Sequence, residues 1–218
     1  MRFHALPAAA AALVALMLAV GCAGLHSNEA VPQIYTLASA APPPAAASAP
    51  ADAATASAVA PGGPGAPAVT VQVLRPLAAP GLDTDQIALL RDTQRLDYYA
   101  ASRWPAPLPE FLQSLAIEAL RASGKFRSVQ PDRGAFAADE VLQIEIRRFQ
   151  AEYAGEGAPV VHVQLLATLG RRNDRSVLAS VSAESSAPAA ENRMQAVIAA
   201  FQSAVGTALT DLAARLPP

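Results

Sequence analysis

The sequence predicts an α+β fold in which a mostly antiparallel sheet carries two helices packed on one face. Three observations predict it. Three consecutive segments in the second half of the chain alternate apolar and polar residues, which is typical of antiparallel strands with one buried face. Two other segments repeat apolar residues three and four positions apart, as amphipathic helices do. The order of these elements, strands, helix, strands, helix, favours helices gathered on one side of the sheet.

The first strands are expected upstream of residue 100. Alternate valines from Val69 to Val73 share one face of a strand that ends before Pro76. Two shorter strands then flank a turn at Asp92-Thr93-Gln94. A fourth short strand follows the first helix. The expected strands of this part are 69–74, 87–90, 95–99 and 126–129.

Both helices are marked by an apolar stripe. The first begins near Pro107 to Pro109, because proline suits the first turn of a helix, and it ends at Gly124. The stripe of the last helix runs from Met194 to Leu212. Between the helices lie the three alternating strands, which predict an antiparallel meander with one dry and one wet face. The meander strands are expected at 142–146, 161–169 and 177–183, with turns at 155–157 and 171–174.

The N-terminus has the three parts of a secretory signal. Arg2 is basic, residues 5–20 are apolar and uncharged, and small residues precede Cys22. The run Leu18-Ala19-Val20-Gly21-Cys22 resembles the lipobox of bacterial lipoproteins, which implies removal of residues 1–21 and attachment of fatty acids such as palmitate to Cys22. The alternative is an ordinary secretory signal with an unrelated cysteine. Because Ala23 rather than an aspartate follows the cysteine, we expect anchoring in the outer membrane, on its periplasmic face.

The organisation of the mature chain leaves one choice open. Residues 22–33 are expected to form a lipidated tether, 34–37 a candidate first strand, and 69–218 the globular domain. Residues 38–68 consist mostly of alanine and proline, with Asp52 as the only charge, and such a segment buries too little side chain to fold. If Ile34 to Leu37 pairs in the sheet, this segment is a long loop inside the domain. If it does not, everything from Cys22 to Ala68 is tether.

Composition argues against several classes of function. The formal net charge is −2, which provides no basic surface for a nucleic acid partner. The single cysteine excludes an internal disulfide and a cysteine-based metal cluster. His162 is expected on the wet face of a strand, and Asp83 and Asp85 in a capped turn rather than in a calcium loop. With no nucleophile motif and no phosphate-binding loop, we expect a protein that is not an enzyme and has no cofactor, catalytic residue or metal site.

One stretch resembles a known family. It consists of Gly81-Leu82-Asp83-Thr84-Asp85-Gln86-Ile87, Arg95-Leu96-Asp97-Tyr98-Tyr99 and Ser102-Arg103-Trp104, with Tyr35-Thr36-Leu37 upstream. In this order and spacing it is similar to the ABC-type transport auxiliary lipoprotein family, including the members associated with paraquat-inducible-type systems. The resemblance extends over nearly all of the mature chain. The segment between residues 38 and 68 is long and rich in alanine for that family.

The resemblance implies an auxiliary role in lipid transport between membranes. The partner it implies is a mammalian-cell-entry (MCE) domain protein of an ABC transporter, besides the membrane reached through the lipid anchor; a homo-oligomer is left open. The alternatives are an outer-membrane assembly lipoprotein that binds a β-barrel, and a lipid-binding enzyme, which the missing nucleophile disfavours. Tyr98, Tyr99 and Trp104 are candidate partner contacts, since such residues are enriched in interfaces. Neighbours in a strand point to opposite faces, so one tyrosine should be buried and the other exposed.

Overall fold

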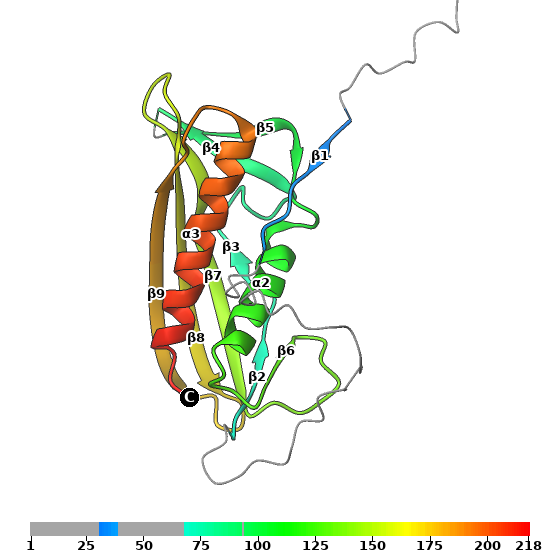
Figure 1. The fold of residues 1–218 in the computed structure, drawn as a ribbon. Coiled ribbons are helices and arrows are strands. Elements are labelled where there is room, and N and C mark those ends of the chain that lie inside the picture. The colour runs from blue at the N-terminus through cyan, green and yellow to red at the C-terminus, as the bar shows by residue number, and fades with distance from the viewer. Residues whose placement is uncertain (1–30, 39–67, 93) are drawn as a thin grey trace, which may run out of the picture. The chain divides into compact units, whose positions relative to one another are not determined.

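The computed structural model describes residues 31–38, 68–92 and 94–218 of the chain, and the expected signal peptide, Cys22 and most of the alanine- and proline-rich segment lie outside these ranges. Within them, two helices lie against one face of a nine-stranded sheet (Figure 1). The elements are β1 (Gln33–Ile34), β2 (Thr70–Val73), β3 (Leu77–Ala78), β4 (Gln86–Arg91), β5 (Arg95–Arg103), α2 (Leu108–Ala122), β6 (Ser128–Pro131), β7 (Glu140–Tyr153), β8 (Val160–Arg171), β9 (Val177–Pro188) and α3 (Met194–Arg215).

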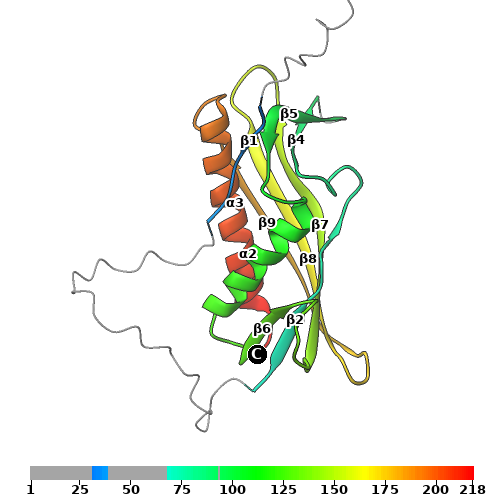
Figure 2. The same cartoon turned by 90° about the vertical axis from the view of Figure 1, so that its right-hand side faces the viewer.

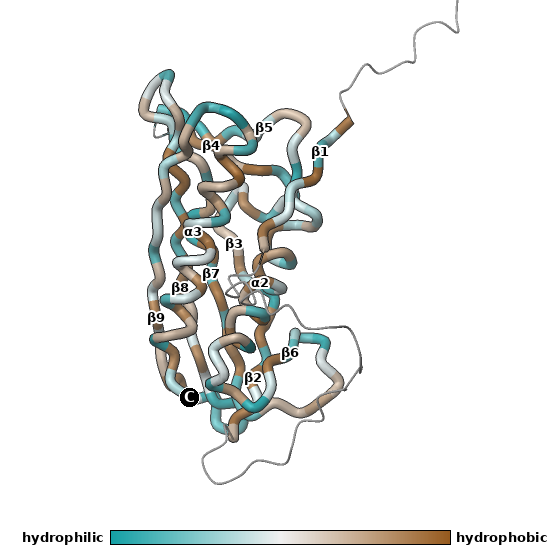
Figure 3. Tube along the Cα trace, in the orientation of Figure 1, coloured by the Kyte–Doolittle hydropathy of each residue, from teal (hydrophilic) through white to brown (hydrophobic). Residues whose placement is uncertain are grey.

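The predicted meander is confirmed as the antiparallel series β7, β8 and β9. Its register runs from Glu140 opposite Arg171 to Glu152 opposite Val160, with a shift between Ile146 and Arg148. This bulge inserts one residue into β7, so the buried positions change from even-numbered residues before it to odd-numbered residues after it. Phe149 therefore faces the core. Apolar residues fill the inner face of all three strands, whereas polar residues such as those of β9 occupy the outer face. Figure 3 shows the same division along the chain.

The prediction of a mostly antiparallel sheet is wrong, because the second edge of β7 is paired in parallel. Three short strands, β2, β3 and β4, follow one another along this edge, opposite Glu140 to Leu142, Glu145 to Ile146 and Ala151 to Tyr153. They behave as one strand interrupted at Pro76 and Pro80, since proline removes a ladder hydrogen bond. The chain then crosses through α2 before it reaches β7, and such crossovers produce parallel neighbours. The sheet is therefore mixed, and the α+β class holds.

The first strand is docked in the sheet. β1 pairs in parallel with β5, and the amide of Tyr35 donates to the carbonyl of Arg103 at 2.9 Å. Leu37 is 4% exposed and belongs to the hydrophobic core. Of the two arrangements left open by the sequence, the structure has the docked one, although the paired strand is Gln33–Ile34 rather than the expected 34–37. The segment between residues 38 and 68 therefore joins two parts of the same compact unit, Pro32–Pro218.

The helices close the core over the inner face of the sheet. α3 packs against β8 and β9, and α2 lies beside it over β3 and β6 (Figure 2). α3 is long and apolar enough to cross a membrane by composition alone, but half of its apolar window is buried inside the domain. Residues such as Val197, Phe201 and Leu212 occupy the buried face. We therefore read α3 as the central helix of the domain, as its stripe predicts.

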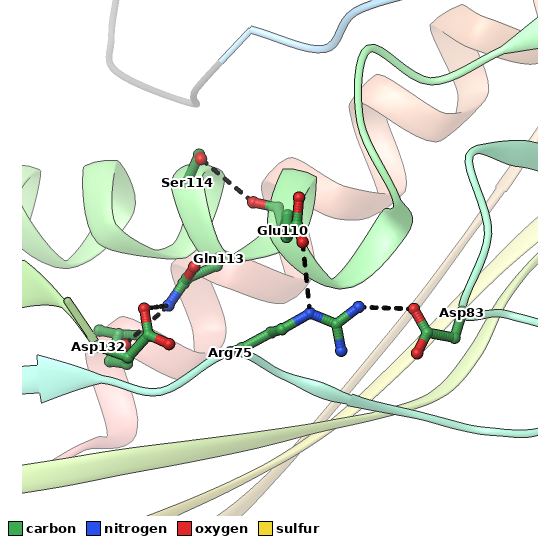
Figure 4. A network of polar contacts seen from close by, with 7 residues as sticks. Arg75, Asp83, Glu110, Gln113, Ser114 and Asp132 are labelled. Carbon is green, nitrogen blue, oxygen red and sulfur yellow. Dashed lines mark hydrogen bonds and ion pairs between the residues drawn. The ribbon is translucent and has the colours of Figure 1, made fainter.

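A polar network fixes the first half of α2 on the sheet (Figure 4). Arg75, which follows β2, pairs with Asp83 at 2.7 Å and lies 3.6 Å from Glu110 in the first turn of the helix. These carboxylates raise the pKa of the Arg75 guanidinium. One turn further on, Gln113 donates from Nε2 to the carbonyl of Val73 at 2.9 Å. The contacts hold the helix against the interrupted strand and so fix the spacing between β2 and α2.

Candidate partner surface and anchoring segment

The residues that carry the family resemblance contact one another in the structure. The turn from Gly81 to Asp85 receives the start of α2, because the carbonyl of Thr84 accepts the Leu108 amide at 2.9 Å and that of Asp85 accepts the Trp104 amide at 2.7 Å. α2 has no side-chain cap of its own. The backbone of the turn thus satisfies the Leu108 amide, which the helix start would otherwise leave unpaired.

Asp83 and Asp85 are both engaged by arginines. Asp83 pairs with Arg75, and Asp85 pairs with Arg103 of β5 at 2.7 Å. This arrangement supports the interpretation of a structural turn. Among the residues the structure describes, no group of three or more histidine, cysteine, aspartate or glutamate side chains is placed to hold a metal ion. His162 lies on the outer face of β8, with Nε2 3.9 Å from Glu152.

Trp104 is not a surface residue, which corrects its nomination as a partner contact. Its side chain is 2% exposed and lies among the rings of Phe111, Phe149 and Phe201, with ring centroids at 5.5, 5.9 and 5.3 Å. These rings come from α2, β7 and α3. Trp104 therefore joins both helices to the sheet. Proline at position 105 and the turn at Asp85 bring it there directly before the helix begins.

Tyr98 and Tyr99 do not divide into one buried and one exposed residue, because both are half-buried. The hydroxyl of Tyr98 donates to the carbonyl of Gly81 at 2.9 Å, so this ring folds over the turn. Gly81 has φ +84°, and a Cβ at this position would lie 2.4 Å from Cδ2 of Leu96. The expected division into one buried and one exposed tyrosine fails because a different element covers each ring. The Gly81 turn partly covers Tyr98, and the end of β7 partly covers Tyr99.

Tyr99 belongs to a polar aromatic group at the end of the β4–β5 hairpin. Its hydroxyl lies 2.9 Å from that of Tyr153, which donates to Oδ1 of Asn192 at 2.9 Å. Burial raises the pKa of the Tyr99 hydroxyl, and the hydrogen bond with Tyr153 adds to this shift. The guanidinium of Arg91 lies over the Tyr153 ring, 5.3 Å from its centroid. We call Arg91, Tyr99, Tyr153 and Asn192 the tyrosine group.

Residues 31–38, which lead from the side of Cys22 into the domain and which we call the anchoring segment, are held at their end by a residue that the sequence did not single out. Gln202 of α3 accepts the amide of Ala38 at 2.7 Å and donates to its carbonyl at 2.8 Å. The position of Gln202 beside the apolar stripe of α3 does not predict a contact with the backbone of Ala38. Val31, ahead of β1, is 85% exposed, and Ile34, within β1, is 70% exposed. The chain thus enters the domain through an exposed apolar stretch and is then fixed by Leu37 and Gln202.

The chain is similar to one known protein family and to several solved structures. The family model of the ABC-type transport auxiliary lipoprotein component matches residues 35–213. The crystal structure of XCC0632 from Xanthomonas campestris, of family DUF330, is 29% identical with a TM-score of 0.62, over 69% of this chain and 86% of that one. Lipoprotein GNA1162 of Neisseria meningitidis is 15% identical with a TM-score of 0.37, over 62% and 94%. PelC of Paraburkholderia phytofirmans, solved as a dodecamer, is 18% identical with a TM-score of 0.40, over 66% and 88%. No curated protein sequence matches the chain.

Proposed function

The chain belongs to the ABC-type transport auxiliary lipoprotein component family, and from this membership we propose that it is a non-catalytic, lipid-anchored periplasmic subunit of an ABC transporter. We propose further that the transporter contains an MCE protein and moves lipids between the two membranes, with this subunit in the outer membrane. The lipobox around Cys22 and the family match support the proposal. The observation that carries it is the docked anchoring segment.

The docked strand sets the distance between the anchor and the domain. Gln33, the first residue of β1, lies eleven residue-to-residue steps after Cys22, with ten residues in between. At about 3.3–3.6 Å per residue, a lipid on Cys22 can be at most roughly 40 Å from the sheet. The alanine- and proline-rich segment adds nothing to this reach, because it follows β1. Such a short tether keeps the domain near its own membrane, where it can serve as the attachment point of a partner that extends from the other membrane.

Of the three residues nominated from the sequence, Tyr99 lies in the tyrosine group, and we propose this group as the partner contact. Tyrosine and arginine are enriched among interface hot spots, and an aromatic ring with a fixed hydroxyl can add area at little conformational cost. Arg91 is exposed, whereas Tyr98 also supports the Gly81 turn. Arg91 is therefore the cleaner residue to substitute.

The test is capture of the partner from membranes of the native organism. The full lipoprotein, carrying a photo-crosslinker at position 95 beside the tyrosine group, is irradiated in cells and its adducts are identified by mass spectrometry. We expect an MCE protein; an adduct with an outer-membrane β-barrel would support the alternative function instead. Arg91→Ala should lower the yield of the MCE adduct, whereas Arg147→Ala, on the bulge of β7, should not. Equal yields from both variants would show that the contact lies elsewhere.

A further inference from the structure

A buried carboxylate lies at the end of the domain where β7 begins. Glu140 is 8% exposed, and no donor of the described chain reaches its Oε2 atom. Arg171 is its direct neighbour on β8, yet the guanidinium of Arg171 turns to Asp174, at 3.6 Å. A carboxylate oxygen without a hydrogen bond is costly to bury. Such a side chain is explained when a ligand supplies the missing donor.

The carboxylate borders a cavity of about 520 Å³ with charges of both signs. Besides Glu140, the wall contains Asp139, Arg171, Arg172 and Asn173, together with the apolar side chains of Val69 and Ala138. Asp139 uses Oδ2 to accept the Thr70 amide at 2.9 Å, so its other oxygen remains available at the exposed rim. The cavity is therefore lined by two carboxylates from the start of β7 and by two arginines from the end of β8, with Glu140 directly opposite Arg171 in the register.

A second cavity shares the two arginines and continues on the outer face of the sheet. Its volume is about 580 Å³, and its wall adds Arg175 together with apolar Leu74 and Val141. Arg172 is held in place by its hydrogen bond to Oε1 of Gln72 at 2.7 Å. Arg175 has φ +59° at the tip of the β8–β9 turn, a conformation that is uncommon for a residue other than glycine. Arg171 and Arg172 thus line both cavities, of which the first also contains the two carboxylates and the second contains Arg175 and apolar side chains.

We propose that these adjoining cavities bind a zwitterionic headgroup that carries a primary ammonium next to a phosphate, as phosphoethanolamine does. The ammonium donates to Glu140 and Asp139, the phosphate is bound by Arg171 and Arg172, and the remainder of the ligand extends toward Leu74 and Val141. A cation alone would be repelled by the arginines, and an anion alone would leave Glu140 without a donor. A group that carries both charges pairs with the carboxylates through its cation and with the arginines through its anion. This inference rests on the proposed role in lipid transport and names a ligand class for it.

The ammonium hydrogens make the proposal specific. A choline headgroup has the same two charges, but its nitrogen bears methyl groups and cannot donate to Oε2 of Glu140. A glycerol headgroup has the phosphate without the cation. Since a hydrogen bond to a charged group contributes about 1.5–3 kcal/mol, the ethanolamine form should bind roughly ten-fold or more tightly than the choline form. Soluble glycerophosphodiesters of the three headgroups isolate this difference from the membrane.

The experiment titrates the full lipoprotein in dodecyl maltoside with these three compounds by calorimetry. A parallel arm offers the corresponding diacyl phospholipids in mixed micelles, so that tighter binding of the diacyl forms identifies a membrane lipid and equal binding identifies the free headgroup as the ligand. We expect Glu140→Gln to remove the preference for ethanolamine over choline. Arg171→Gln and Arg172→Gln should weaken all phosphate compounds. The matched control Glu184→Gln, on the exposed face of β9, should change nothing.

Several results would overturn the inference. They are equal binding of the ethanolamine and choline compounds by the unmodified protein, no binding of either, or an unchanged preference in Glu140→Gln. N-acetyl-lysine methylamide binding as tightly as the ethanolamine compound would also overturn it, because the phosphate would then play no part and a partner's lysine would explain the site. If Glu140→Gln does not fold, the preference for the ethanolamine over the choline compound is measured on the unmodified protein and on Asp139→Asn, and it tests the proposal in the same way. Crosslinking to the transporter is independent of these titrations, so failure here leaves the proposed function intact.

Discussion

Replacement of Trp104 by alanine tests whether the aromatic motif serves the core or a partner. The side chain is 2% exposed and contacts rings from α2, β7 and α3. Removing a buried tryptophan typically destabilises a domain by about 3–5 kcal/mol, and each aromatic pair adds roughly 0.5–1.5 kcal/mol beyond its buried area. For a chain of this size, 1 kcal/mol lowers the melting temperature by about 2–4 °C, so we expect a decrease of roughly 6–20 °C.

The assay is thermal unfolding of the mature lipoprotein followed by far-ultraviolet circular dichroism. Fluorescence does not serve, because Trp104 is the only tryptophan. Phe136→Ala is the control: Phe136 is 80% exposed, and its loss should leave the melting temperature nearly unchanged. Trp104→Phe, which keeps a ring in the core, should fall between the two. A Trp104→Ala protein that melts like Phe136→Ala but no longer captures the transporter would refute the structural assignment.

Three further predictions follow from the chain. Cys22→Ser should abolish labelling by a radioactive fatty acid and leave the precursor uncleaved; equal labelling of both proteins would disprove the lipobox assignment. Gly81→Ala should destabilise the domain by about 1–3 kcal/mol in urea unfolding, since φ is +84° and the added Cβ meets Leu96, whereas Gly157→Ala, with open space around it, should be neutral. Burial raises the pKa of Glu140 in the folded protein, so between its unfolded and folded values the folded state binds more protons and stability falls as the pH rises. Glu140→Gln should therefore melt above the unmodified protein at neutral pH and lose this advantage towards about pH 4; a constant difference across that range would contradict the linkage.

The elements with strong periodicity could be predicted from the sequence. The meander and the stripe of α3 repeat over many residues, so their type and face follow directly from the pattern. The pairing of the short strands could not be predicted in the same way. β2, β3 and β4 contain few residues each, and nothing in a four-residue strand states which edge it joins or in which direction. Their parallel pairing depends on the crossover through α2, which is a property of the whole chain.

The candidate sites show the same contrast. The lipobox is local, so Cys22 could be nominated from the sequence. Glu140 could not, because it sits at the start of an alternating strand and only its pairing opposite Arg171 places it beside the arginines of the next turn. Gln202 was missed for a related reason: its partner is the backbone of Ala38, far away in the sequence. Contacts to backbone atoms leave no residue-type signal in either segment.

The motif that identifies the family is explained by folding rather than by binding. Gly81 is required by its backbone conformation, Asp83 and Asp85 are paired with arginines, and Trp104 is buried. A motif whose members mainly satisfy one another specifies how α2 begins on the sheet and says little about what the protein binds. Residues that distinguish one member's partner or ligand must then lie outside it. Arg91, Tyr153 and Asn192 of the tyrosine group meet this condition, whereas Tyr99 belongs to the motif. The Glu140 cavities, at the opposite end of β7, meet it as well.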